Sequence, residues 1–195
     1  MKSTTFSASD TAGRPSVTAF AGRRVDARSA RQIRFPPQNV RMVEEGIREC
    51  LRKAVCVLVC SAACGSDLLA LGIAGDLGIR RRVLLPFDRA RFRETSVTDR
   101  PGNWGEIYDR VLDEVQHQRD LVVLDYEQTD PAAYARTNAA IVDEALRISR
   151  EENKMAQALV VWDGKSRGSD DLTAHFLDDA RGKGMPILEV LTLMP

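Results

Sequence analysis

The sequence predicts an α/β protein: a Rossmann-like three-layer sandwich built on a mainly parallel sheet of about six strands. Three observations lead to this prediction. Short apolar runs alternate along the chain with segments of helical periodicity. The runs are continuous rather than alternating, which is typical of strands covered by helices on both faces. The stretch 55–85 has the order strand, small-residue turn, helix and strand, which is a βαβ unit.

The expected strands are bounded by glycine, proline or polar turns. They are expected at 16–21, 55–60, 82–85, 121–124, 158–162 and 186–191. The first strand ends at a Gly-Arg-Arg turn, and the last follows Pro186. Right-handed crossovers between such strands produce the layered sandwich.

The expected helices carry apolar residues at helical spacing. They are expected at 38–51, 67–77, 104–118, 138–152 and 171–183. In the first of them, Val43, Ile47 and Leu51 mark the buried side. The segment 88–103 shows no clear periodicity and is long for a connection. We expect it to fold over a ligand site as a lid, with a solvated surface excursion as the alternative.

The length and charge of the chain limit the classes of protein to which it can belong. The chain has 195 residues, enough for a full α/β core, and its formal net charge is +0, which argues against a general polyanion binder. No apolar run reaches membrane-spanning length, so no membrane partner is expected. Residues 1–15 are rich in Ser and Thr and lack the apolar core of a signal peptide. We expect a disordered tail at 1–15, a single domain at 16–195 and a cytoplasmic protein.

The cysteines and histidines do not indicate a metal site. Cys50, Cys56, Cys60 and Cys64 contain no CxxC pair, and the chain's two histidines lie far from them in sequence. We therefore predict neither a metal ion nor a cofactor.

The turn after the second strand is the first candidate site. Its residues are Ser61, Ala62, Ala63, Cys64, Gly65, Ser66 and Asp67. Small side chains permit close approach to the backbone, and the first amides of a helix attract anions. The alternative is that the small residues only allow the helix to pack tightly on the sheet.

Further candidate contacts follow other strands. The turn Gly22, Arg23 and Arg24 could contact an anion, because arginine makes forked hydrogen bonds to phosphate. Arg91 and Arg93 in the expected lid could add charge. A solvated basic turn is the plain alternative for both groups.

The pattern 61–70, with Gly78 and Leu85-Pro86-Phe87, resembles the signature of the SLOG superfamily. That group includes the DNA-processing protein A family, the Lonely-guy phosphoribohydrolases and nucleotide-sensing domains. The match is closer to an uncharacterised bacterial branch with "RFP" before the first helix and "WDG" near the end. The Gly-Gly of the signature is Ala62-Ala63 here, and the glutamate that serves Lonely-guy chemistry is not found at the matching place.

The resemblance implies three functional hypotheses. The first is binding or sensing of a nucleotide-derived, phosphate-containing ligand in signalling, with Asp67, or Asp163 beside Gly164, accepting hydrogen bonds from ribose. The second is hydrolysis of a nucleotide N-glycosidic bond, with Asp163 and Asp170 as the catalytic carboxylates. The third is single-stranded DNA binding, which the balanced charge disfavours. For Asp170 and Asp171, helix capping is the favoured alternative. Relatives commonly form dimers, so a homodimer is expected.

Overall fold

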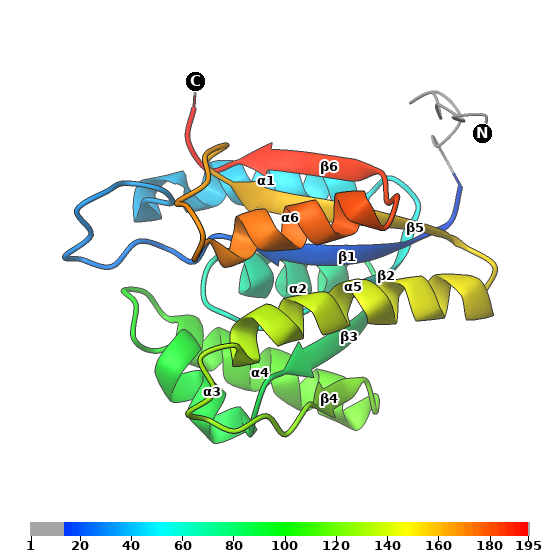
Figure 1. The fold of residues 1–195 in the computed structure, drawn as a ribbon, viewed down its shortest axis with the longest axis horizontal. Helices are drawn as coiled ribbons and strands as arrows, with labels where there is room; N and C mark the ends of the chain where they lie inside the picture. The colour runs from blue at the N-terminus through cyan, green and yellow to red at the C-terminus, as the bar shows by residue number, and fades with distance from the viewer. Residues whose placement is uncertain (1–13, 195) are drawn as a thin grey trace.

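Within residues 14–194, which the computed structural model describes, six strands form one sheet (Figure 1). The strands are β1 (Ser16–Gly22), β2 (Val55–Cys60), β3 (Arg80–Leu85), β4 (Leu121–Val123), β5 (Met155–Trp162) and β6 (Ile187–Leu191). They lie in the order β4-β3-β2-β1-β5-β6, and each neighbouring pair is parallel. The predicted Rossmann-like α/β fold is confirmed. Of the expected tail, residues 1–13 lie outside the described residues.

Helices cover both faces of the sheet. They are α1 (Val40–Leu51), which follows the 3-10 turn η1 (Pro37–Asn39), α2 (Ser66–Asp76), α3 (Arg89–Ser96), α4 (Trp104–His117), α5 (Ala133–Glu151) and α6 (Leu172–Gly182). Figure 1 shows α5 and α6 in front of the sheet and α1, α2 and α4 behind it. The same division appears in the core, because α1, α2 and α4 share one buried cluster and α5 and α6 share another.

Alternate residues of the strands enter the two cores. In β1, Val17 and Ala19 belong to the α5–α6 side, whereas Phe20 belongs to the opposite side. In β2, Leu58 and Val59 divide in the same way. Because both faces are apolar, the strands appear in the sequence as continuous apolar runs.

The order of strands creates a switch point between β1 and β5. The chain moves outward from β1 through β2 and β3 to β4, then crosses back through α5 to place β5 on the other side of β1. Gly22 at the end of β1 pairs with Val161 of β5. The segments that follow these two strands therefore leave the same point of the carboxyl edge, where open α/β sheets commonly bind ligands.

The expected lid contains a regular helix, α3. Asp88 caps it by accepting a hydrogen bond from the Arg91 amide at 2.9 Å, and Phe92 and Ser96 form its buried side. Only one large apolar residue lies on that side, so the hydrophobic periodicity of this helix is weak in the sequence.

Two further boundaries differ from the prediction. The helix α5 begins at Ala133, five residues before the expected start, because the Asp130 carboxylate accepts the Ala132 amide at 2.8 Å and organises the turn. The strand β5 begins at Met155 rather than Ala158. Its early part contains buried Gln157, a polar residue that donates to the Ser16 hydroxyl at 3.1 Å and interrupts the apolar run.

Candidate functional site

A cavity of about 750 Å³ opens at the carboxyl edge of the sheet, beside the ends of β1 and β2. Its walls come from the loop 23–34 after β1, the turn after β2, α3 and the loop behind it, and the starts of α5 and α6. In Figure 1 the arrowheads of the strands and these segments lie toward the left. Since ligands of parallel α/β sheets bind at this edge, the cavity is the candidate site.

Arginine dominates the charge around the cavity. Six arginines line it: Arg23, Arg24, Arg31, Arg34, Arg100 and Arg167. Two aspartates, Asp26 and Asp67, are the acidic residues of the lining. Five of the six arginines lie within 4.0 Å of an aspartate carboxylate, so part of their charge is balanced inside the protein.

The predicted site residues divide between this cavity and other places. Gly22, Arg23, Arg24, Ser61, Ala63 and Asp67 line the cavity, whereas Ala62, Cys64, Gly65, Ser66, Arg91, Arg93, Asp163, Gly164 and Asp170 lie outside its lining. Asp163 lines a smaller neighbouring pocket of about 560 Å³ instead.

Backbone amides of the turn after β2 already have acceptors in the protein. The Ala63 amide donates to the Asp67 carboxylate at 3.1 Å, and the Cys64 amide donates to the Ser96 carbonyl at 3.0 Å. The Ser66 amide donates to the Arg23 carbonyl at 3.2 Å. Three of the amides expected to bind an anion are therefore already bound within the chain.

Gly65 serves close packing of the turn on the loop after β1. Its φ is +91°, and a Cβ built there would lie 2.7 Å from the Val25 amide nitrogen. A Cβ on Gly22 would lie 2.5 Å from the Ser66 Cβ. Glycine at positions 22 and 65 therefore allows the turn to pack tightly on the loop after β1. Tight packing was the alternative to a role of this turn in ligand binding.

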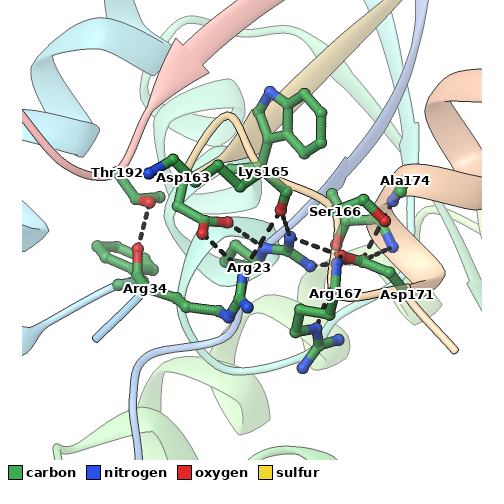
Figure 2. A network of polar contacts seen from close by, with 12 residues as sticks. Arg23, Arg34, Asp163, Lys165, Ser166, Arg167, Asp171, Ala174 and Thr192 are labelled. Carbon is green, nitrogen blue, oxygen red and sulfur yellow. Dashed lines mark hydrogen bonds and ion pairs between the residues drawn. The ribbon is translucent and has the colours of Figure 1, made fainter. Parts of the chain in front are cut away.

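A buried ion network closes the switch point between β1 and β5 (Figure 2). Arg23, which is 4% exposed, donates from Nε to Asp163 at 2.9 Å and from Nη1 and Nη2 to Asp171 at 2.5 and 2.8 Å. Its Nη2 also donates to the Lys165 carbonyl at 2.8 Å. The second oxygen of Asp163 accepts from Arg34 at 2.7 Å. These carboxylates saturate Arg23, so the predicted anion contact is replaced by internal ion pairs.

The predicted catalytic carboxylates do not line the cavity. Asp163 is bound by two arginines of the network, and Asp170 lies outside the network as an exposed residue. Gly164 is an exposed residue of the same loop, with a φ of +75°.

Asp171 joins α6 to this network. Its carboxylate caps α6 by accepting the amides of Thr173 and Ala174 at 3.1 and 3.2 Å, so the capping interpretation is confirmed for this residue. Burial opposes ionisation of Asp171, but hydrogen bonds from Arg23 and from the Arg167 amide outweigh it and hold its pKa well below the usual range. The network therefore fixes the loop that carries the Arg167 side chain to the cavity.

Arg24 reaches the cavity from the loop after β1. Its guanidinium pairs with Asp99 and donates to the Cys64 sulfur at 3.4 Å. Burial raises the pKa of the Cys64 thiol despite this cation. Cys64 is thus held as a neutral thiol in a packed turn.

Arg91 and Arg93 lie on parts of α3 that do not line the cavity. Arg91 pairs with Glu94 at 3.2 Å, and Arg93 forms a two-pronged contact with Asp109 of α4, with its shortest distance 2.8 Å. The helix instead presents Thr95 and Ser96 to the cavity. The expected ligand contacts of these two arginines are corrected accordingly.

Several contributors to the wall are absent from the predicted set, among them Arg100, Arg167, Tyr134 and Arg31. Tyr134 of α5 lines the cavity, and its hydroxyl lies 3.2 and 3.1 Å from the hydroxyls of Thr95 and Ser96, which connects α5 to α3. Arg31 lies on the exposed loop after β1. An isolated arginine in a polar loop carries no distinctive pattern, so the sequence offers no signal for it.

Two buried polar atoms of the cavity wall have no hydrogen-bond partner among the described residues: the Ser61 hydroxyl and the Arg100 Nε. The nearest carboxylate to the Arg100 Nε is Asp99 at 3.5 Å. Buried polar groups of folded proteins are nearly always paired. Ser61 and Arg100 both line this cavity, so the two unpaired atoms belong to residues of the same site.

Comparison with known structures gives distant likenesses. The fold is similar to the crystal structure of DNA processing protein A from Streptococcus pneumoniae, with a TM-score of 0.40 and 14% sequence identity. The match covers 92% of this chain and 60% of that chain, so this chain spans less than two thirds of the neighbour's length. No protein-family model matches the sequence, and neither does any curated protein sequence.

Asp67 differs from the other buried carboxylates at this edge of the sheet. It is 7% exposed, and its hydrogen bond comes from the Ala63 amide rather than from a guanidinium. Burial raises the pKa of its carboxyl to about 7, against weaker opposing effects of the Ala63 amide and Arg24. Asp67 therefore titrates near neutral pH within the wall of an arginine-rich cavity.

Two further properties concern the described residues only. Over 14–194, the helices are too short or too polar to cross a membrane. The same residues contain no group of three His, Cys, Asp or Glu side chains placed to hold a metal ion.

Proposed function

We propose that this protein binds a nucleotide-derived, phosphate-containing ligand in the arginine-lined cavity beside β1 and β2. The observation that carries the proposal is the pair of buried, unpartnered atoms, the Ser61 hydroxyl and the Arg100 Nε, in one cavity wall. A hydroxyl can donate or accept a hydrogen bond, and a guanidinium only donates. Together they suit an oxygen-rich anion.

The available positive charge supports an anionic ligand. Arg31, Arg100 and Arg167 line the cavity, and within the described residues no carboxylate accepts a side-chain hydrogen bond from them. Guanidinium groups bind phosphate through paired, charge-assisted hydrogen bonds. These three side chains are the proposed phosphate contacts. The nearest aspartate oxygens lie 3.5 Å from Arg100 and 3.6 Å from Arg167, whereas Arg23 and Arg34 are held by shorter ion pairs of 2.9 and 2.7 Å.

The size of the cavity supports a small metabolite. A volume of about 750 Å³ falls within the range of about 300–1,000 Å³ for small-molecule sites. Polar and aromatic groups such as Asn138 and Tyr134 line the same space and offer contacts for a sugar or base.

Ligand binding can be measured by thermal unfolding with a panel of ribonucleoside monophosphates, ADP-ribose and cyclic dinucleotides. A ligand at a hundred times its dissociation constant is expected to raise the free energy of unfolding by about 2.7 kcal/mol. Arg100→Ala is expected to weaken that ligand about tenfold or more, because a charge-assisted hydrogen bond is lost.

The matched control is the double variant Arg91→Ala, Arg93→Ala, whose side chains lie outside the cavity lining. It is expected to bind as the natural sequence does. A panel without any stabilising nucleotide, or equal affinity in the Arg100 variant and the control, would contradict the proposal.

A further inference from the structure

Asp67 is one of two aspartates in a cavity whose other charged lining residues are arginines. Its carboxylate lines the cavity, and no arginine, lysine or histidine among the described residues lies within ion-pair distance of it. Asp163 and Asp171, by contrast, are each bound by a guanidinium. Backbone amides of Ala63 and Gly22 already interact with this carboxylate. In its ionised form it accepts hydrogen bonds and repels phosphate, so a ligand group that contacts it would have to be a donor.

Ser61 supplies a second polar group from the same β2–α2 connection. It follows the last residue of β2 directly, and its buried hydroxyl lacks a partner among the described residues. Ser61 and Asp67 both line the cavity. The connection thus adds a carboxylate and a hydroxyl to a cavity that is also lined by Arg31, Arg100 and Arg167, the proposed contacts of the anionic end of the ligand.

The vicinal hydroxyls of a ribose match this arrangement. They supply two adjacent donors that can meet a carboxylate, and each also accepts a hydrogen bond. A 2′-deoxyribose lacks one donor, which would leave a buried acceptor unpaired. Sites built to bind a hydroxyl discriminate strongly against analogues that lack it.

We infer that Asp67, assisted by Ser61, recognises the ribose hydroxyls of the ligand, so that the cavity selects ribonucleotides over 2′-deoxyribonucleotides. This inference rests on the proposed nucleotide site and assigns the part of the ligand that faces the β2–α2 connection. Asp67 acts as a specificity-determining residue, and Arg100 remains the anion contact.

The groups that face Asp67 allow its role to be tested by pH. Arg24 from the loop after β1 and the buried Cys60 thiol of β2 are the charged or titratable neighbours that interact with it. Arg24 is engaged by Asp99. Since the pKa of free Asp67 is about 7, ribose donors that favour its ionised form should tighten binding as pH rises from 6 to 8. A protonated Asp67 that donated to phosphate would give the opposite trend.

The test is calorimetric titration of the full chain with the four 5′-ribonucleoside monophosphates and their 2′-deoxy counterparts. The natural sequence is expected to bind the preferred ribonucleotide at least tenfold more tightly than its 2′-deoxy form. Asp67→Asn should reduce this ratio to about twofold or less, and Ser61→Ala should reduce it partly. Asp170→Asn, which changes an exposed aspartate outside the cavity lining, should leave the ratio unchanged.

Equal affinities for the two sugars in the natural sequence would overturn the inference, and that measurement needs no variant to fold. A ratio that persists in Asp67→Asn, or affinity that falls from pH 6 to pH 8, would overturn it as well. In those outcomes nucleotides still bind through Arg100 and the proposed function stands. Absence of any nucleotide binding would instead overturn both.

Discussion

At the scale of single residues, the environment of Asp67 makes its carboxyl unusual. The side chain is 7% exposed, and its hydrogen bond from the Ala63 amide does not compensate burial. The sequence could suggest Asp67 as a helix-start residue or a ribose contact. Only the packing of β1 and α2 around it shows that its pKa is raised to about 7.

This pKa predicts how stability changes with pH in Asp67→Asn. The folded protein keeps a proton that the unfolded chain releases above its ordinary pKa of 3.8, so the stabilising contribution present at low pH is lost as pH rises through about 7. Asparagine does not titrate. The variant should therefore gain stability relative to the natural sequence, by roughly 2 kcal/mol between pH 5 and pH 8.

Urea unfolding of both proteins at a series of pH values measures this difference. Curves of stability against pH that run parallel for the two proteins would show that Asp67 is ionised in the folded state across the whole range.

At the scale of elements, the turn between β2 and α2 is shaped more by packing than by a ligand. Three of its amides are bound within the chain, and Gly65 lies against the backbone of the loop after β1. The sequence pattern of small residues was compatible with both interpretations. To decide between packing and ligand binding, one must know where the loop after β1 lies, and that loop is some forty residues earlier in the chain.

The stabilities of Gly65→Ala and Gly168→Ala can be compared to distinguish the cost of backbone strain from the cost of steric overlap with the loop after β1. Both glycines have positive φ, +91° and +101°, but a Cβ at Gly65 would lie 2.7 Å from backbone, and one at Gly168 meets nothing within 4 Å. Positive φ alone costs an alanine about 1–2 kcal/mol. We expect that loss for Gly168→Ala and a loss at least about 1 kcal/mol larger for Gly65→Ala, because steric overlap adds to the strain.

Chemical unfolding of the two variants gives the comparison directly. Equal losses would mean that the loop after β1 moves away from the turn without cost.

The helix α3 shows why the lid was only partly predictable. Its charged residues, among them Arg91 and Arg93, dominate the segment, and Phe92 and Ser96 alone form the buried side. Arg91 and Arg93 are two positions apart, so they leave the helix in different directions. A ligand role for a pair of arginines cannot be inferred until the helix and its neighbour α4 are placed.

At the scale of the whole molecule, the strands and most helices follow from the sequence because both cores are made of continuous apolar runs. The ion network does not follow, since Arg23 meets carboxylates 140 and 148 residues away. It joins the end of β1 to the end of β5 and the start of α6, and so connects an early segment of the chain to a late one. The expected homodimer stays a prediction.

Asp171→Ala tests the contribution of this network to the stability of the fold. The variant removes the cap of α6 and leaves a buried arginine with one fewer carboxylate. Breaking a buried ion pair costs about 3–5 kcal/mol, and loss of a cap adds about 1 kcal/mol. We expect a loss of at least about 3 kcal/mol in urea unfolding.

Asp170→Ala is the matched control, because this neighbouring aspartate is exposed, and its effect should stay within about 0.5 kcal/mol. A loss for Asp171→Ala no greater than that of the control would show that water replaces the network readily.

The ion network at the switch point between β1 and β5 also limits the length of a ligand that can lie along the carboxyl edge of the sheet. A dinucleotide that straddled β1 and β5 would have to displace the Asp163 and Asp171 carboxylates from Arg23, exchanging paired internal charges for its own. The cavity of about 750 Å³ is open without that exchange. We therefore expect the proposed site to accept one nucleoside unit with its phosphates rather than two joined end to end.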